Sequence, residues 1–345
     1  MYHFIINPAS GSGRGRIIWE MIQKELNRLH ITYQSYLLHT SSEAAPLAAA
    51  ISTSGVPSTV IVIGGDGTIN DVINGFTSFE HITFACIPTG SGNDFVRGLS
   101  LSRDPSEALQ TVLHPAEILP VNVGKTIFSL CNQSQTSDAS LSDAGSASGH
   151  HAESFSRSFM ISSGIGFDAA VCYSVDHSRL KRVLNRFHLG KLVYLLTALW
   201  HLCTMKRPDL RISIDDSKTI DCKKAYFAAA MNLPYEGGGF CFAPNARPDD
   251  DQLDLIYVNG ISRLHALCLL PLALKGKHLG HKGIHLVSCK KARIEYLCGS
   301  SDSQNQSPDL RNSSGCCVHT DGEVPAFAET ITLSLHEKKL AVIIR

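Results

Sequence analysis

The sequence predicts an α/β domain with a parallel sheet, followed by a β-rich domain that forms a sandwich with one or two helices. Up to about residue 123, short apolar runs typical of strands alternate with helical segments such as Ile17–Leu29 and Ser42–Ser52. From about residue 124, strand-like runs predominate. These runs are Phe159–Ser163, Leu210–Asp215, Ala225–Met231, Leu253–Val258, Gly283–Ser288 and Ala292–Tyr296, with a last one at Lys339–Ile344. The 345 residues suit about two domains.

The first predicted strand, His3–Ile6, ends in a loop rich in glycine and serine, Asn7–Gly15. Its glycines lack the GxGxxG spacing of a dinucleotide fingerprint. The chain also has no GxxxxGK[ST] motif and no ordered HRD, DFG and APE triplets, which excludes P-loop enzymes and protein kinases. Arg14 and Arg16 could contact phosphate or simply face solvent.

The most informative loop, Gly64–Thr68, follows the β-branched run Val60–Ile63, which is typical of a buried strand. The glycines let the backbone approach a bulky anion, and the residues after Thr68 look like the start of a helix, whose free N–H groups suit phosphate. A carboxylate at Asp66 beside phosphates makes sense if a divalent cation lies between them. For an isolated GGDG, a tight turn with a capping aspartate would be the simpler interpretation.

A third predicted strand, Ile82–Ile87, ends in the loop Pro88–Phe95, which contains serine, threonine, asparagine and aspartate. The carboxyl ends of parallel strands gather at one edge of the sheet, where ligands bind. Three such loops therefore predict a single nucleotide-phosphate and Mg²⁺ site.

The three loops, in this order and at these intervals, resemble the catalytic domain of the diacylglycerol kinase family, which includes soluble bacterial lipid kinases and is similar to sphingosine and ceramide kinases. The C-terminal half continues the resemblance. Its matching segments are Gly164–Ala169 (GxGFDA), Gly190–Tyr194 (GKLAY), Gly237–Gly239 with Ala243–Ala246 (GGG…AP), Asp249–Asp254 (DDGxLD) and Asp321–Glu323 (DGE). The chain departs from the family at Asp251, where glycine is usual. The resemblance covers nearly the whole chain except two polar insertions.

The resemblance implies an ATP- and Mg²⁺-dependent kinase that phosphorylates a lipid hydroxyl, with diacylglycerol giving phosphatidic acid. Asp66 would face the Mg²⁺, and Asp321 or Glu323 would accept the proton of the lipid hydroxyl, with a slight preference for Glu323. As a sequence pattern alone, DGE would be an acidic β-turn. By resemblance, ATP would be held by Asn7, Thr40, Gly64, Gly65, Asp66, Gly67, Thr68, Ile69, Asn70, Asp71, Ser91, Asn93 and Asp94.

Two further sites are implied by the same family. In soluble bacterial members, the DDGxLD loop binds a structural Mg²⁺, which here would involve Asp250 and the main-chain carbonyls of Arg247 and Gln252. Adjacent carboxylates are otherwise a solvated turn, and Asp251 leaves the conformation of the loop open. Asp168 matches a position that contacts the lipid head group in some relatives, and could equally be a turn residue.

Composition agrees with a cytoplasmic enzyme. Lysine plus arginine and aspartate plus glutamate both number 31, so no global field would recruit nucleic acid. The 11 cysteines include no CxxC pair, which suits reduced thiols, and the 16 histidines show no zinc-binding spacing. A strand that begins at residue 3 would leave no room for a signal peptide.

Two apolar segments could meet a membrane. Leu192–Met205 is too short to span a bilayer, and is interpreted as a core-facing helix or a helix at the lipid entrance. Leu264–Leu274 is followed by basic residues that could favour anionic head groups. We therefore expect transient, peripheral membrane contact. A homodimer through an edge strand is a further expectation.

The predicted domain boundaries are 1–123, with 331–345 returning to the first domain as in relatives, and 124–330. The insertions 133–156 and 299–315 are poor in apolar residues and are expected to be mobile loops. Two alternatives to a lipid kinase stay open: an NAD kinase-type phosphotransferase, since that group also uses GGDGT, and a non-catalytic lipid- or nucleotide-binding relative.

Overall fold

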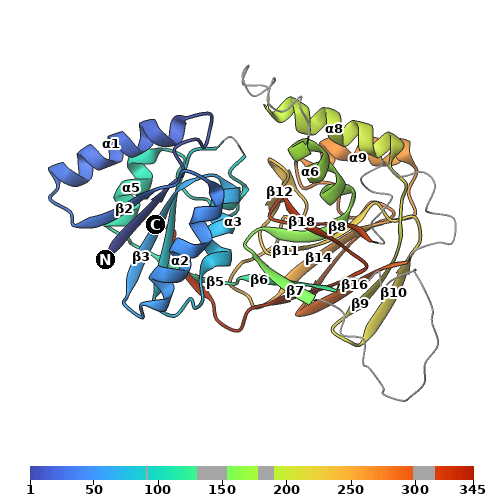
Figure 1. The fold of residues 1–345 in the computed structure, drawn as a ribbon. Coiled ribbons are helices and arrows are strands. Elements are labelled where there is room, and N and C mark those ends of the chain that lie inside the picture. Colours follow the sequence, from blue (N-terminus) through green and yellow to red (C-terminus); the bar gives the residue numbers. More distant parts are fainter. Residues whose placement is uncertain (91, 130–153, 178–189, 298–314) are drawn as a thin grey trace, which may run out of the picture.

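The N-terminal domain is a parallel sheet with helices on both faces (Figure 1). The computed structural model describes residues 1–345 except 91, 130–153, 178–189 and 298–314. The sheet order is β2-β1-β3-β4-β20-β5, and only the pairing of β5 with β20 is antiparallel. Its strands are β1 (Tyr2–Ile6), β2 (Tyr33–Leu37), β3 (Ser58–Gly64), β4 (Ile82–Pro88), β5 (Ile118–Val121) and β20 (Leu340–Ile343).

The helices bury both faces of this sheet, which explains the uninterrupted apolar run in β3. Val60 and Val62 belong to the core on the face of α2 and α3, whereas Ile61 and Ile63 pack on the side of α1 and α5. The helices are α1 (Arg14–Arg28), α2 (Ala44–Thr53), α3 (Asp66–Gly75), α4 (Asp94–Gly98) and α5 (Pro105–Leu113), with a 3₁₀ turn at Ser41–Glu43.

The second domain is a sandwich of two antiparallel sheets, and the sequence predicts this sandwich. One sheet has the order β10-β9-β16-β19-β6-β7 and the other β15-β14-β11-β8-β17-β18. Their strands are β6 (Gly124–Ser129), β7 (Ser154–Phe159), β8 (Ser162–Gly166), β9 (Asp209–Ile214), β10 (Lys218–Cys222), β11 (Phe227–Met231), β14 (Leu253–Val258), β15 (Ile284–Cys289), β16 (Lys291–Leu297), β17 (Cys316–Thr320), β18 (Glu323–Ala328) and β19 (Thr330–Leu335). A small hairpin joins β12 (Tyr235–Glu236) to β13 (Phe240–Cys241).

Three helices cover the outer face of the β8-containing sheet: α6 (Phe167–His177), α8 (Gly190–Thr204) and α9 (Arg263–Ala273). They form a core with β11 and β14 that is separate from the core between the two sheets. None of the described helices is long and apolar enough to cross a membrane.

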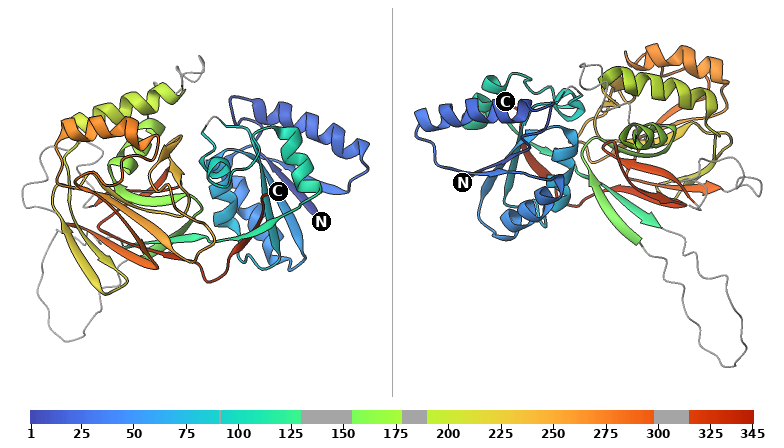
Figure 2. Two further views of the ribbon diagram at one scale, coloured as in Figure 1. Left: turned by 180° about the vertical axis from the view of Figure 1, so that it is seen from behind. Right: turned by 45° about the horizontal axis from the view of Figure 1, so that its top comes forward.

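Two connections join the domains, β5 to β6 and β19 to β20, and the C-terminus lies in the first domain (Figures 1 and 2). Because β19 pairs with β16 and β6, the return to the first domain begins after Leu335 rather than at residue 331. Most of the two predicted insertions lies outside the described residues.

Candidate active site

The three loops singled out in the sequence meet at the carboxyl edge of the parallel sheet. The Asn7 side chain donates a hydrogen bond to the Thr68 hydroxyl at 3.0 Å, and the Thr89 hydroxyl donates to Ser10 Oγ at 2.8 Å. Asp66, the first residue of α3, accepts hydrogen bonds from the N–H groups of Asp94 and Phe95 at 3.0 and 3.3 Å. Asp66 therefore fastens the GGDG loop to the start of α4.

The Asp66 carboxyl lies in a strongly negative surrounding. Burial and the neighbouring Asp94 raise its pKa to about 7, although the two backbone N–H groups lower it. Burial and the neighbouring negative charge disfavour the ionised carboxylate, and a divalent cation would stabilise it. Asp66 is therefore a suitable ligand for such a cation. The donors at this edge thus fit the Mg²⁺ that the sequence predicts.

The DGE segment faces this edge from the other domain. Asp321 and Gly322 form the turn between β17 and β18, with φ angles of 51° and 86°, as expected for an Asp-Gly hairpin. The Asp321 carboxylate accepts hydrogen bonds from the backbone N–H groups of Met160, Ile161 and Ser162 at 2.8, 2.8 and 3.1 Å. A fourth donor is the Asn70 amide of α3, at 2.9 Å. This hydrogen bonding holds Asp321 in place and occupies its oxygens.

Glu323 reaches the beginning of α3. A Cβ atom at Gly67 would stand only 2.9 Å from Glu323 Oε1, so the absence of a side chain at Gly67 makes room for this carboxylate. Glu323 is exposed, whereas Asp321 is partly buried and hydrogen-bonded. The structure therefore brings the Glu323 carboxylate to the beginning of α3, whereas both Asp321 oxygens accept hydrogen bonds from the surrounding chain.

The other residues predicted to bind ATP differ in burial and in their hydrogen-bond partners. Asn70 is fully buried, and its amide oxygen accepts from the Arg157 guanidinium at 2.7 Å, so it also fixes the contact between the domains. Asn93 has a φ of 50° and donates to the carbonyl of Gly90 at 2.7 Å, which shapes the third loop. Thr40 is exposed just before Ser41–Glu43, and Asp71 is partly buried in α3. Ser91 lies outside the described residues.

The predicted structural-metal loop lies against the connections between the domains. Asp251 has a φ of 62°, so it adopts the conformation for which glycine is usual. Its carboxylate pairs with Lys339 Nζ at 2.8 Å. The Asn122 amide bonds both Oδ1 and the N–H of Asp251 when it is oriented with its nitrogen toward Oδ1 and its oxygen toward the N–H. Lys339 also donates to the carbonyl of Asp249 at 2.8 Å.

Two of the three adjacent carboxylates, Asp249 and Asp251, therefore form ion pairs with basic side chains. Arg247 pairs with Asp249 at 3.1 Å, while Asp250 accepts only a hydrogen bond from the Gln252 N–H, at 3.0 Å, among the contacts of the described residues. Asp250 is exposed and offers hard oxygen atoms, which fits the predicted Mg²⁺. That cation, with Arg247 and Gln252 carbonyls, stays a prediction.

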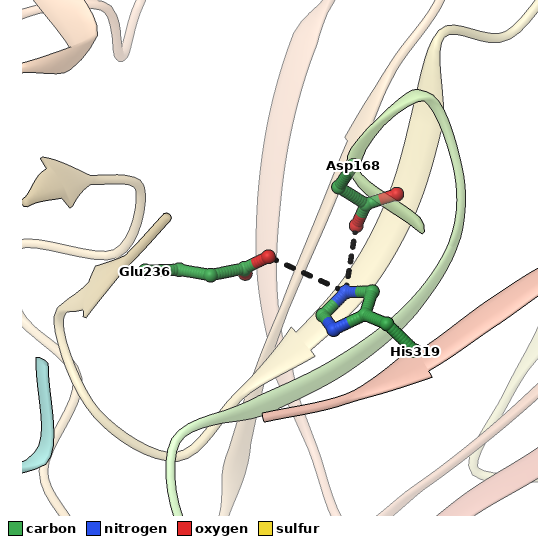
Figure 3. Close-up of side chains that lie close together, drawn as sticks. All are labelled: Asp168, Glu236 and His319. Carbon is green, nitrogen blue, oxygen red and sulfur yellow. Dashed lines mark hydrogen bonds and ion pairs between the residues drawn. The ribbon is translucent and has the colours of Figure 1, made fainter. Parts of the chain in front are cut away.

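Asp168 belongs to a buried cluster that the sequence reasoning missed. In Figure 3, the Asp168 and Glu236 carboxylates point toward His319 Nε2, at 3.0 and 3.3 Å. Burial lowers the pKa of His319, but the two carboxylates together raise it to about 9. Glu236 directly precedes the GGG segment, and His319 lies two residues before DGE. This closeness to family motifs is the sequence feature that could have identified them as candidate site residues.

A narrow apolar cavity of about 50 Å³ lies between α8, α9 and the outer face of the sheet that contains β8. Phe167, which lines it, is adjacent in sequence to Asp168. Leu202 of α8 and Ala266 and Leu269 of α9 also line it. An apolar space of this kind suits the hydrocarbon part of an amphiphilic molecule.

Comparisons with known proteins agree with this geometry. Residues 1–126 match the model of the diacylglycerol kinase catalytic domain, and residues 161–341 match the YegS C-terminal NAD kinase beta sandwich-like domain. The chain is 32% identical over 292 residues to the Bacillus subtilis (strain 168) protein named "Putative lipid kinase YtlR", covering 84% of this chain and 87% of that protein. It is 25% identical to a diacylglycerol kinase of the same organism, covering 84% of each chain.

The fold has a counterpart among solved structures. A diacylglycerol kinase from Bacillus anthracis str. Sterne aligns with a TM-score of 0.63 at 20% identity, over 99% of this chain and 96% of that one. This likeness concerns the fold, with its parallel sheet and its β-rich second domain.

Proposed function

The chain belongs to the diacylglycerol kinase family, and from that premise we propose that it transfers the γ-phosphate of ATP to the hydroxyl of diacylglycerol, giving phosphatidic acid. Members of this family are phosphotransferases with an alcohol acceptor. The observation that carries the proposal is the approach of Glu323, from the β-rich domain, to the start of α3 beside Asp66. A base and a phosphate site then face each other across the domain boundary.

In this mechanism, the chain positions the reactants and neutralises charge, as phosphoryl transfer requires. The N–H groups at the start of α3 would bind the phosphates of ATP. Asp66 and the loop ending at Asp94 would hold Mg²⁺, which supplies charge neutralisation at the transferred phosphoryl group. Glu323 would accept the proton of the lipid hydroxyl, and Asp321 would hold the hairpin that carries Glu323.

The apolar cavity supports a lipid acceptor. Phe167 in the cavity and Asp168 in the polar cluster are consecutive residues, so an acyl chain beside the former would bring a head group toward the latter. The cavity is narrow, and α8 and α9 would need to separate slightly to admit a chain. The nicotinamide dinucleotide acceptor of the alternative activity has no use for such a space.

The outer surfaces of α8 and α9 support membrane contact. Trp200 and Leu264 are 67% and 72% exposed, and Leu196, Leu267 and Leu274 are also exposed. Arg263, Lys275 and Lys277 are exposed beside them. An apolar surface with a basic margin suits an anionic membrane surface, and this one lies directly over the apolar cavity. We propose that lipid enters from a membrane bound here.

The test is transfer of label from γ-labelled ATP with Mg²⁺ to a panel of lipids in mixed micelles, with NAD assayed in parallel. Label in diacylglycerol, and its loss in Glu323→Gln, would support the proposal. Label in another lipid would retain the kinase and change its acceptor. Label in NAD alone would overturn the proposal, as would nucleotide binding without transfer to any acceptor.

A further inference from the structure

The cluster of Asp168, Glu236 and His319 has the composition of a metal site. Its three ligand atoms lie within 4.8 Å of one another, and no other group of three such side chains among the described residues meets this condition. Each side chain comes from a different element: the first turn of α6, the strand β12 and the strand β17. The cluster therefore ties together three segments that are far apart in the sequence (Figure 3).

The space for the cluster is built into the sheet. Gly164 of β8 pairs with His319 of β17. A Cβ atom at Gly164 would stand 2.7 Å from Asp168 Oδ2, so any other residue would displace that carboxylate. The absence of a side chain here is what lets Asp168 reach His319.

The protein does not provide hydrogen-bond partners for all the buried polar atoms of this cluster. Asp168, Glu236 and His319 are 8%, 6% and 0% exposed. His319 Nε2 has at most one proton for two carboxylates, and Glu236 Oε2 and His319 Nδ1 are buried without a hydrogen-bond partner. The hydroxyl of Ser162 faces Glu236 closely enough to lower the pKa of that carboxyl. Unsatisfied polar atoms gathered in one place indicate an ion or water that belongs there.

We propose that Asp168, Glu236 and His319 bind a divalent transition-metal cation of the Mn²⁺ or Zn²⁺ kind. Bonds of roughly 2.0–2.2 Å to nitrogen and oxygen place neighbouring ligands about 3–3.5 Å apart, and the ligand atoms here are 3.0 and 3.3 Å from His319 Nε2. The cation would take the lone pair of a neutral imidazole and offset both carboxylate charges. Imidazole favours Zn²⁺ and carboxylates favour Mn²⁺. The inference does not depend on the identity of the lipid acceptor.

The test uses the full chain, stripped of metal and titrated with Mn²⁺ alone, without nucleotide. We expect one tightly bound Mn²⁺ per chain whose pulsed paramagnetic resonance spectrum shows coupling to an imidazole nitrogen. Zn²⁺ should displace it. The substitutions Asp168→Asn, Glu236→Gln and His319→Gln should each weaken Mn²⁺ binding ten-fold or more. His278→Gln is the matched control, because His278 is equally buried but bonds only the carbonyl of Phe242 among the described contacts.

Coupling to an imidazole nitrogen distinguishes Mn²⁺ bound at this cluster from Mn²⁺ bound at the predicted Mg²⁺ sites. The predicted Mg²⁺ sites at Asp66 and Asp250 have only oxygen ligands, so Asp66→Asn should retain the nitrogen-coupled signal. Wild-type protein whose bound Mn²⁺ shows no nitrogen coupling, and from which Zn²⁺ displaces no Mn²⁺, would overturn the proposal, whether or not the variants fold. His319 would then be a protonated bridge between two carboxylates.

Discussion

Asp66→Asn should change how the stability of the α/β domain depends on pH. Burial and the charge of Asp94 raise the pKa of Asp66 to about 7 from its ordinary value of 3.8. The folded state therefore binds a proton more tightly than the unfolded state does. Stability should rise as the pH falls through 7, and the gain is complete only below the pKa of the unfolded chain.

The size of the effect follows from this shift. A pKa raised by about three units corresponds to about 4 kcal/mol over the full range. Between pH 8 and pH 5.5, about 2 kcal/mol of that free energy of unfolding is gained. Asparagine has no such proton to bind, although it loses one of the hydrogen bonds from Asp94 and Phe95. The difference between wild type and variant should thus change by about 2 kcal/mol across this pH interval, with the variant relatively more stable at pH 8.

The assay is urea unfolding without Mg²⁺ or nucleotide, followed by the fluorescence of Trp19. This residue is buried in the core of the α/β domain, whereas Trp200 is exposed in the other domain. Glu117→Gln, at an exposed carboxylate of the same domain, controls for a general effect of removing charge. Parallel pH profiles for wild type and Asp66→Asn would refute the reasoning, since they would mean that Asp66 is ionised in the folded state at little cost.

Three other predictions test neighbouring parts of the site. Glu323→Gln should lower kcat by about 10²–10⁴-fold with an unchanged unfolding midpoint, and a kcat close to wild type would exclude it as the base. Asp321→Asn should cost about 2–4 kcal/mol of unfolding free energy, because an amide NH₂ would face backbone N–H groups; urea titration measures this, and an unchanged midpoint would contradict it. Trp200→Ser should weaken sedimentation with anionic vesicles, and the Trp200 emission of wild type should shift to the blue on binding; equal sedimentation would remove α8 from the membrane surface.

Local patterns in the sequence were sufficient for the fold class and for the loops of the first domain. Strand β3 is recognisable because it is buried on both faces, and its junction with Asp66 combines glycine, a carboxylate and a helix start. Leu253–Val258 has the same bounds as predicted, since it is a continuous apolar strand between turn residues. The expected strand Phe159–Ser163 instead spans parts of β7 and β8, because the chain bends at Met160 and Ile161, whose N–H groups bond Asp321 rather than a neighbouring strand.

Contacts between distant segments could not be read in this way. Sequence offers no means to choose between Asp321 and Glu323, which lie two residues apart. The geometry favours Glu323 because the bend after β7 supplies three N–H donors to Asp321 from 159–161 residues away. His319 and Glu236 were missed for a similar reason: each is a single residue without a spacing pattern, and only tertiary packing brings the β12–β13 hairpin to the sheet that contains His319.

Contacts at the domain boundary explain why Asp251 stands where the family usually has glycine. A non-glycine residue in the left-handed region costs of order 1 kcal/mol, so its side chain must contribute contacts that glycine lacks. Asn122 lies on one of the connections between the domains and Lys339 on the other, and Asp251 contacts both. The loop thereby links the two segments about which the domains would move. Since Asp66 and Glu323 lie in different domains, their separation depends on these connections, and we therefore expect substitution of Asp251 to change the rate of phosphoryl transfer without altering a contact to either substrate.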